Sequence, residues 1–310
     1  MKNKIGFVIL HYNDYEVTSK CVDSILNLDE QDRIEIVIVD NNSQNDSGTR
    51  LQANYGKNSE KIGILLLDKN YGFSRANNIG YEYLLKTGNQ FDFIFIANND
   101  IIFCQKNMIS LLEEQYQQEK FYLAGPDVWA VYKKEHQNPL SLSPRTKEEI
   151  QDWIVLNKRK LRMVEFETIL HGIWTIVNDT KLYKMYRKMI EKNMKDSFVR
   201  EYAEKANNVV LTGACLIFSK DFIEYKIKPF NPETYFYHEE DILTTRCLMN
   251  KWKISYLPEL QVEHLEGVVT KQKGYYKRMK FRYKNFVNSG TIYLEYLNKQ
   301  ADKNFADRGK

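Results

Sequence analysis

The sequence predicts an α/β protein built on a mostly parallel, twisted sheet that is flanked by helices. Short apolar runs rich in Ile, Val and Phe are typical of buried parallel strands. Four such runs occur, at Ile5–Leu10, Ile34–Val39, Ile62–Leu67 and Phe91–Ala97. Segments with helical spacing separate them, at Val17–Leu28, Ser47–Tyr55 and Ala76–Leu85. Regular alternation of strands and helices favours right-handed crossovers and a parallel sheet.

Composition excludes several classes of protein. The 310 residues are 43% hydrophobic and 28% charged, which fits neither a disordered nor a collagen-like chain. A net charge of +4 is too weak to indicate nucleic acid as a partner of the whole molecule. The four cysteines form no C-x-x-C pair, which favours a reducing compartment over a disulfide framework or zinc site. No apolar stretch approaches the roughly 20 residues of a spanning helix, so we expect a cytoplasmic protein, soluble or peripheral on the inner face of the plasma membrane.

Changes in residue composition and hydrophobic pattern divide the chain into four parts. The strand–helix alternation occupies residues 1–125, and an insertion rich in Lys, Arg, Glu, Met and Tyr follows at 126–208, expected to be mostly helical. Apolar segments typical of a buried core recur at 209–270, beginning with the run at Val209–Phe218. A helix opened by acidic residues follows, and then two short strands near Ile254–Tyr256 and Gln261–Glu263. A basic, aromatic helical tail covers 271–310. The insertion contacts an acceptor in one interpretation and is a packing subdomain in the other.

The polar residues that end each predicted strand are the candidates for ligand contact. In parallel α/β sheets, ligands bind at the carboxyl ends of the strands. The residues at these ends are His11, Tyr12, Asn13, Asp40, Asn42, Asn70, Asn98, Asn99 and Asp100. Asx turns explain such residues equally well without a ligand.

The string Asn70-Tyr71-Gly72-Phe73-Ser74-Arg75-Ala76-Asn77-Asn78-Ile79-Gly80 is the most specific motif. Gly72 permits a tight turn, and Ser74 is expected to cap the following helix, whose free N–H groups suit an anionic ligand. The string resembles that of family 2 glycosyltransferases, particularly bacterial rhamnosyl- and galactofuranosyl-transferases of polysaccharide biosynthesis. The resemblance covers residues 5–125 and 209–270.

This resemblance implies a GT-A fold, with a nucleotide-sugar-binding half at 1–125 and an acceptor-binding, catalytic half at 209–270. It implies a UDP- or dTDP-sugar donor, a lipid-linked or oligosaccharide acceptor, and inversion at the anomeric carbon. Asp40 would contact the nucleoside, with His11, Tyr12 and Asn13 flanking the base. The other residues assigned to donor binding are Asn42, Asn70, Gly72, Phe73, Arg75, Asn77, Asn78, Asn98 and Asn99.

The segment Asn98-Asn99-Asp100 stands where the family usually carries a D-x-D motif that binds Mg²⁺ or Mn²⁺. Asn98 replaces the first carboxylate, and loss of one unit charge at about 4 Å forfeits up to roughly 4 kcal/mol of attraction at a dielectric constant near 20. The resemblance assigns the metal or diphosphate contact to Asp100 and His264. A polar turn and a structural histidine are the simpler alternatives.

The triplet Glu239-Glu240-Asp241 opens a predicted helix. The helix dipole alone favours acids there, but inverting transfer requires a carboxylate that removes the acceptor proton. In the family the second member of an E-D pair is this base. Register from the preceding aromatic residues selects Glu240, whereas residue type selects Asp241, and we favour Glu240. Glu239 and Gly213, the latter allowing close approach, belong to the acceptor side.

The tail carries seven basic residues and no acid between Lys271 and Lys284, with aromatic residues interleaved. An anionic membrane surface, single-stranded nucleic acid and a solvated helix all fit this pattern. Because the family commonly uses lipid-linked acceptors, we favour the membrane and expect no nucleic acid. The alternative to an enzyme is a catalytically degenerate nucleotide-sugar-binding subunit or scaffold. A nucleotidyltransferase ranks lower, because no Gly-rich triphosphate loop follows the first strand.

Overall fold

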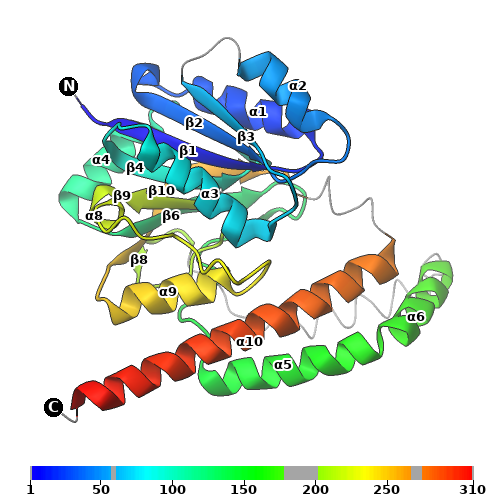
Figure 1. The fold of residues 1–310 in the computed structure, drawn as a ribbon. Coiled ribbons are helices and arrows are strands. Elements are labelled where there is room, and N and C mark those ends of the chain that lie inside the picture. The colour runs from blue at the N-terminus through cyan, green and yellow to red at the C-terminus, as the bar shows by residue number, and fades with distance from the viewer. Residues whose placement is uncertain (1, 57–60, 178–201, 267–273, 309–310) are drawn as a thin grey trace.

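The computed structural model describes residues 2–56, 61–177, 202–266 and 274–308. Its first part alternates strands and helices as expected (Figure 1). The elements are β1 (Lys4–His11), α1 (Tyr15–Leu26), the 3-10 turn η1 (Gln31–Arg33), β2 (Ile34–Asp40), α2 (Ser47–Tyr55), β3 (Ile62–Leu66), α3 (Gly72–Lys86) and β4 (Phe91–Asn98).

The second part mixes short strands with longer helices. Its elements are β5 (Ile101–Ile102), α4 (Met108–Gln118), β6 (Leu123–Ala130), β7 (Glu135–His136), α5 (Lys147–Arg162), α6 (Val164–Val177), β8 (Ala206–Asn207), β9 (Cys215–Ser219), α8 (Lys220–Ile223), α9 (Glu239–Met249), β10 (Ile254–His264) and α10 (Tyr275–Arg308).

One sheet unites both parts, in the order β3-β2-β1-β4-β9-β6-β10-β5, with β7 beside β6 and β8 beside β10. The first four strands are mutually parallel, and β6 and β10 form a second parallel pair. Strand β9 is antiparallel to both neighbours and joins the two groups. The mostly parallel sheet flanked by helices predicted from the sequence is therefore confirmed.

Successive residues of β1 supply two different hydrophobic cores, because neighbouring side chains of a strand point to opposite faces. Phe7 and Ile9 pack with α1, α2 and α4 on one face. Val8 packs with α3, α8 and α9 on the other. The strands are buried on both faces, which explains their almost uninterrupted apolar sequences.

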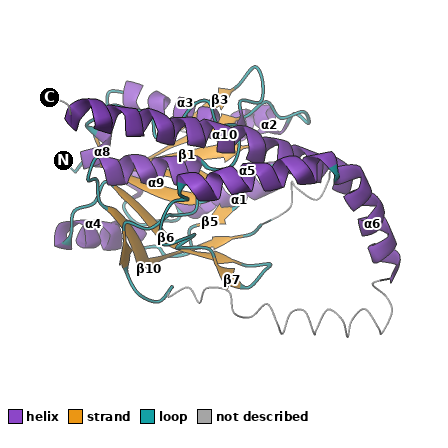
Figure 2. Ribbon diagram, turned by 90° about the horizontal axis from the view of Figure 1, so that it is seen from below, coloured by secondary structure: helices purple, strands orange, loops and turns teal. Residues whose placement is uncertain are grey.

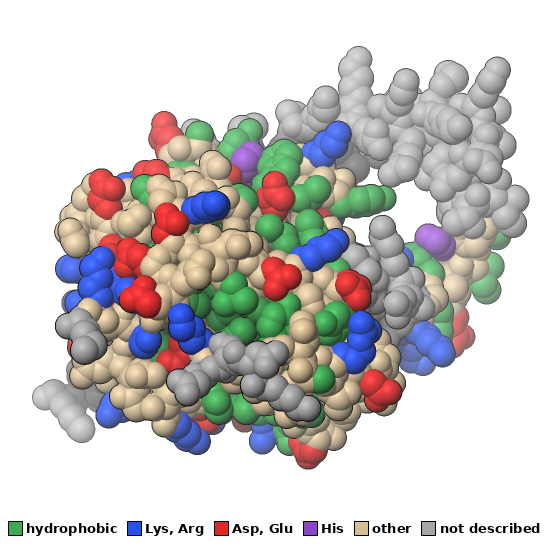
Figure 3. All heavy atoms as spheres, turned by 90° about the horizontal axis from the view of Figure 1, so that it is seen from above, with side chains coloured by type: hydrophobic (Ala, Val, Ile, Leu, Met, Phe, Trp, Pro, Cys, Tyr) green, Lys and Arg blue, Asp and Glu red, His purple; other side chains and the backbone are tan. Residues whose placement is uncertain are grey.

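A separate helical layer lies below the sheet in Figure 1, where α10 runs beside α5 and contacts α6 and α9. Ile150 and Ile154 of α5, Ile242 of α9 and Tyr293 of α10 form its small core. On the face seen from above, Lys and Arg side chains are interspersed with Asp and Glu side chains (Figure 3).

Several local expectations differ from the structure. Within the apolar run at Val209–Phe218, strand β9 begins only at Cys215. The two short strands expected near 254–263 are one strand, β10, whose register on β6 shifts between Leu257 and Gln261. The insertion is helical in α5 and α6, but it begins inside a strand, β6, which contains Gly125 and Pro126, residues that normally argue against a strand.

Candidate active site

Three strand ends bring the predicted ligand residues to one edge of the sheet. His11 of β1 pairs in register with Asp40 of β2, and Leu10 pairs with Asn98 of β4. The backbone N–H of Asn98 donates to the carbonyl of Ala214 at 2.9 Å, just before β9. Parallel register therefore places these side chains along one continuous edge.

His11 is wholly buried at this edge, and both its ring nitrogens bond within the protein. Nδ1 lies 2.6 Å from the Thr18 hydroxyl, and Nε2 lies 2.8 Å from the Ser47 hydroxyl. Because the Thr18 hydroxyl donates to the carbonyl of Asp14, it accepts from Nδ1–H, which leaves Nε2 to accept from Ser47. Burial lowers the pKa of His11 to about 4, so the ring is neutral near pH 7.

Asp40 is buried beside this histidine but does not form a charged pair with it. Its Oδ1 lies 3.9 Å from Nε2 of His11, too far for a hydrogen bond to the neutral ring. Burial raises the pKa of Asp40, against the hydrogen bonds that it accepts from the backbone and hydroxyl of Ser43. Gly48 lies so close that a Cβ there would stand 2.2 Å from Oδ2, so only glycine fits against this carboxylate.

Asparagine side chains shape the loops around Asp40. Asn13 and Asn42 have φ of 60° and 61°, in the left-handed region that asparagine tolerates. The Asn13 side chain accepts from the backbone of Gln44, and the Asn42 amide donates to the carbonyl of Asp68. The loops that follow β1, β2 and β3 are thus joined to one another by hydrogen bonds.

The turn before α3 depends on Gly72. Its φ is +77°, and a Cβ would lie 2.4 Å from the carbonyl oxygen of Tyr235, so any side chain is excluded. That oxygen accepts from the backbone N–H of Phe73 at 2.8 Å. Asn41 fixes the same turn, accepting from the N–H of Tyr71 and donating to the carbonyl of Gly72. Sequence reasoning did not assign Asn41 to the site, although its place directly after Asp40 was the available clue.

The polar residues of the α3 motif are largely structural. Ser74 does not cap the helix as expected, because it lies inside α3 and hydrogen-bonds the Thr234 hydroxyl at 2.7 Å. Asn78 bonds both the N–H and the carbonyl of Phe230. Asn77 donates to a carbonyl of its own helix. Ser74, Asn77 and Asn78 therefore hold α3 to itself and to the 230–235 loop.

Asp100 and His264 lie together, as the resemblance implied. Nε2 of His264 is 3.0 Å from Oδ1 of Asp100, and Nδ1 is 2.7 Å from Oε1 of Gln137. The Gln137 amide donates in turn to Glu266, whose carboxylate also pairs with Lys133 at 2.7 Å. Glu266 only accepts, so Gln137 must turn its oxygen toward His264, and Nδ1 must carry a proton.

This chain of hydrogen bonds leaves the lone pair of a neutral His264 Nε2 directed at a carboxylate oxygen. Two acceptors at 3.0 Å repel unless a proton or a metal cation lies between them. A partner that fixes the second ring nitrogen is the usual arrangement around a metal-ligating histidine. Within the described ranges, no cluster of three His, Cys, Asp or Glu residues forms a complete metal site. The pair therefore fits a cation that is also held by substrate oxygens. Sequence reasoning missed Gln137, which lies in a segment without a motif.

Glu240 faces the same edge from α9. The backbone N–H of Gly213 donates to its Oε1 at 3.2 Å, and a Cβ at Gly213 would stand 3.0 Å from that oxygen and 3.3 Å from the ring of Phe73. Gly213 therefore brings the acidic helix next to the turn before α3. Its neighbour Ala214 is the residue bonded to Asn98. The loop of Gly213 and Ala214 therefore contacts both Glu240 and the end of β4, the strand that leads to Asp100.

The two candidate bases differ sharply in their surroundings. Burial and the nearby charge of Asp241 raise the pKa of Glu240. Burial also opposes ionisation of Asp241, but hydrogen bonding to His238 and the charge of Arg145 outweigh it and lower the pKa of Asp241. Oδ2 of Asp241 lies 2.7 Å from the guanidinium of Arg145 and 3.0 Å from Nδ1 of His238. Both oxygens of Asp241 are occupied, because Oδ1 accepts from the backbone of Arg145.

Glu239 completes the triplet as a buried carboxyl. It is 6% exposed, and its Oε2 has no hydrogen-bond partner among the residues that the structure describes. Burial, and secondarily the charge of Glu240, raises its pKa well above the usual range.

Helix α10 fastens the turn that carries these acids. Tyr237 and His238 both have positive φ, of 72° and 63°, immediately before α9. The Ser289 hydroxyl donates to the carbonyl of Phe236 at 2.7 Å. One helical turn later, the Tyr293 hydroxyl donates to the carbonyl of Arg145 at 2.8 Å. Strained residues persist only where their surroundings fix them, and α10 supplies part of that constraint.

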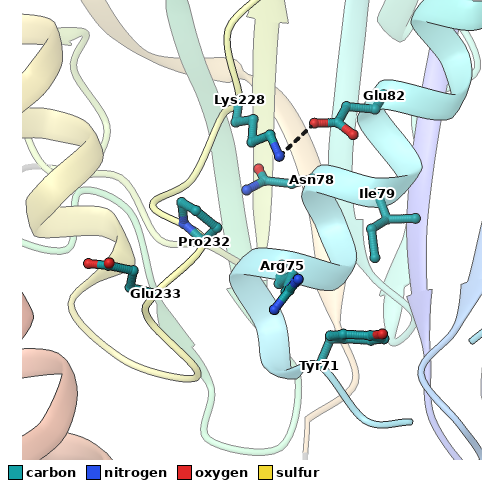
Figure 4. Close-up of a pocket in the computed structure, with 8 residues that line it drawn as sticks. All are labelled: Tyr71, Arg75, Asn78, Ile79, Glu82, Lys228, Pro232 and Glu233. Carbon is teal, nitrogen blue, oxygen red and sulfur yellow. Dashed lines mark ion pairs between the residues drawn. The ribbon is translucent and has the colours of Figure 1, made fainter. Parts of the chain in front are cut away.

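A cavity of about 470 Å³ lies between α3 and the 228–233 loop, and its lining does not include the triplet Glu239–Asp241 (Figure 4). Arg75 lies over the ring of Tyr71, 4.9 Å from its centroid, and Lys228 pairs with Glu82 at 3.0 Å across the cavity. The remaining lining residues are Asn78, Ile79, Pro232 and Glu233. Arg75 and Asn78 are thus the predicted donor residues that border it.

Comparison with known proteins is consistent with this arrangement. The family model described as glycosyl transferase family 2 matches residues 7–225. No curated protein sequence matches the chain.

Solved structures match over most of the chain. The crystal structure of S. aureus TarS 1–349 shares 12% identity over 84% of this chain and 60% of its own, with a TM-score of 0.51. The crystal structure of GalNAc-T7 with UDP, GalNAc and Mn²⁺ shares 13% identity over 85% of this chain and 44% of its own, with a TM-score of 0.54. The chain thus spans 60% or less of these neighbours' lengths. At such identity the likeness shows the fold alone. Together with the family match, it establishes that the chain belongs to glycosyl transferase family 2 and has a GT-A fold.

Proposed function

We propose that the protein transfers a sugar, with inversion, from a UDP- or dTDP-sugar to a hydroxyl of a lipid-linked glycan during synthesis of a bacterial capsule, O-antigen or cell-wall polysaccharide. The observation that carries the proposal is the position of Glu240. The Glu240 carboxylate accepts from the backbone of Gly213, and the next residue, Ala214, is hydrogen-bonded to Asn98 at the end of β4. Burial raises the pKa of Glu240. A base is most effective when its pKa approaches the working pH.

In this proposal the donor lies along the strand ends. Asp40 accepts hydrogen bonds from the nucleoside, and the loops that carry Tyr12, Asn13 and Asn42 surround the base. The turn at Gly72 and Phe73 brings the backbone close to the diphosphate. His11 does not contact the base in this proposal, because it is wholly buried and both its ring nitrogens are already hydrogen-bonded within the protein.

Asp100 and His264 would hold the cation, Mg²⁺ or Mn²⁺, with amide oxygen available from Asn98 or Asn99. When bound, such a cation would neutralise the charge that develops on the departing diphosphate. Carboxylate, imidazole and amide oxygen are acceptable ligands for either ion. The presence of Mn²⁺ in the crystal structure of GalNAc-T7 supports a divalent metal.

Glu240 acts on the acceptor. It removes the proton of the attacking hydroxyl as that oxygen forms a bond to the anomeric carbon, while the bond to the diphosphate oxygen breaks and the nucleoside diphosphate leaves. Asp241 does not touch substrate in this scheme. Its pairing with Arg145 and His238 holds the turn that positions Glu240.

The test is transfer by the purified protein from a panel of UDP- and dTDP-sugars with Mn²⁺. Glu240→Gln should lower transfer by about 10²- to 10⁴-fold while a thermal-shift assay still detects donor binding. Asp241→Asn is the matched control, since it alters a neighbouring carboxylate that is already occupied. It should lose less activity than Glu240→Gln and, because the charge of Asp241 raises the pKa of Glu240, it should move the pH profile of kcat to lower pH. Full activity of Glu240→Gln would refute the assignment.

A second candidate rests on Asn98, which stands in place of a metal-binding carboxylate. In that case the protein binds donor but supports no turnover, as a subunit of a polysaccharide-assembly complex. Wild-type protein that binds nucleotide-sugar and neither transfers nor hydrolyses it would favour this alternative.

Association with the inner face of the plasma membrane completes the proposal, through the basic residues of 271–284. Lys271 and Lys273 lie outside the described residues, whereas Lys277, Lys280 and Lys284 are exposed at the start of α10. None of the described helices is long and apolar enough to cross a membrane.

A further inference from the structure

Helix α6 exposes several large apolar side chains on one face. Four of its large apolar side chains face solvent, with exposed fractions of 56% for Phe166, 61% for Ile169, 37% for Leu170 and 52% for Ile173. These positions are three or four residues apart and share one face of the helix. Large exposed apolar patches on soluble proteins mark interaction sites.

The opposite face of α6 is polar and packs on α10. Glu167 accepts hydrogen bonds from the hydroxyls of Tyr275 and Tyr283, and the ring of His171 stacks on Tyr275 at 3.7 Å. Glu165 accepts similarly from Tyr276. The acidic groups of this helix are thus used internally, and its apolar side chains are left to the outside.

Basic side chains surround this apolar face. Lys158, Arg159 and Arg162 are exposed in the last turns of α5, directly before α6. The start of α10, which contacts both α5 and α6, exposes Lys277, Lys280, Arg282 and Lys284. An apolar helical face with a cationic border is complementary to anionic lipid, which offers both apolar chains and negative charge. An apolar protein surface without acidic residues would leave the cationic side chains without a partner.

The position of α6 agrees with such a partner. Figure 1 shows α6 and the start of α10 at the end of the molecule toward which β1 runs, the end that carries the candidate active site. Figure 2 shows α6 projecting beyond the sheet. None of the described helices is long and apolar enough to cross a bilayer, so we place the described residues of α6 in the plane of the surface.

We propose that α6 inserts its face of Phe166, Ile169, Leu170 and Ile173 into the surface of an anionic bilayer, while the basic residues of α5 and α10 contact lipid phosphates. This inference rests on the proposed function, since it explains how the active site reaches a lipid-linked acceptor. It adds an apolar anchor to the electrostatic attraction of the 271–284 segment. Each apolar side chain withdrawn from water strengthens binding by about tenfold, and each basic residue near the surface by roughly fivefold.

Sedimentation of the full-length protein with vesicles tests the proposal. Vesicles with about one third phosphatidylglycerol should bind the protein, in proportion to anionic lipid content and less strongly at high salt. The triple variant Phe166→Ser, Ile169→Gln, Ile173→Gln should bind at least tenfold more weakly, because the affected side chains leave the bilayer. The control Leu142→Gln, Met249→Gln alters exposed apolar residues elsewhere (60% and 40% exposed) and should bind as wild type.

Transfer to a water-soluble acceptor separates this inference from the proposed function. The triple variant should keep wild-type activity on that acceptor, whereas failure of wild type to transfer at all would refute the function and not the anchor. Equal vesicle binding by wild type and the triple variant would overturn the role of α6.

A fluorescent reporter identifies the occupant of the face. Phe166→Cys, made in a Cys104→Ser background and labelled with an environment-sensitive dye, should shift to shorter wavelength only when anionic vesicles are added. A shifted spectrum before vesicles are added would overturn the proposal, since another part of the chain or a second copy would then cover α6. Sedimentation equilibrium distinguishes these two, because only a second copy makes the wild type dimeric and the triple variant monomeric.

Discussion

Replacement of His11 should change how stability depends on pH. The ring is wholly buried, and its pKa is about 4, against 6.5 for an unperturbed histidine. Between these values the unfolded chain binds the proton that the folded protein excludes, so the free energy of unfolding falls as pH falls. The full effect is about 3 kcal/mol, of which about 2 kcal/mol is lost between about pH 7.5 and pH 5.

Urea denaturation across this pH range measures the effect. His11→Asn retains a donor toward the Thr18 hydroxyl and removes the titrating group. We expect it to be less stable than wild type at about pH 7.5, by about 1 kcal/mol for the lost hydrogen bond, and to lose about 2 kcal/mol less on acidification. Carboxylates titrate in both proteins, so the difference between the two slopes isolates His11.

His171→Asn is the matched control, because His171 is exposed on α6. It should show the pH dependence of wild type. Parallel curves for wild type and His11→Asn would refute the reasoning, since they would mean that the buried ring takes up a proton as readily as the unfolded chain does.

The remaining predictions concern the turn before α3 and the histidine of the proposed metal site. Gly72→Ala should lose more stability and more donor affinity than Gly88→Ala in urea and thermal-shift assays; both glycines have positive φ, but only Gly72 lacks room for a Cβ. Strain alone costs about 1 kcal/mol, so equal losses would contradict the contact argument. Gln137→Met should weaken Mn²⁺ binding about tenfold in calorimetry, because His264 loses its orienting partner, whereas Gln118→Met on α4 should not. Unchanged Mn²⁺ affinity in Gln137→Met would remove that role.

Much of the fold can be predicted from local sequence, because each of the first strands along the chain is a continuous apolar run. The runs at Ile5 and Ile34 are buried on both faces, so apolar continuity marks them without reference to the rest of the chain. The pattern failed for β6, where Gly125 and Pro126 are tolerated because Asn138 bonds the Pro126 carbonyl and β10 pairs alongside.

The candidate site divides in the same way. Strand-end position selected Asp40 and Asp100, whereas His264 and Glu240 were selected from the family resemblance. The structure places Asp100 3.0 Å from His264 and Glu240 against Gly213. The residues that fix their states, such as Gln137 and Arg145, could not be predicted, because they come from a segment without a motif and act only through tertiary contacts. Ser74 shows the converse, since a residue typical of a helix cap was used for a contact with Thr234, far away in the chain.

The attachment of α10 to the acidic turn has a consequence for the order in which the protein matures. Phe236 and Arg145 leave the ribosome before Ser289 and Tyr293, which fasten them. In the proposed scheme, Glu240 would therefore reach its position only after α10 has been synthesised and has docked on the acidic turn.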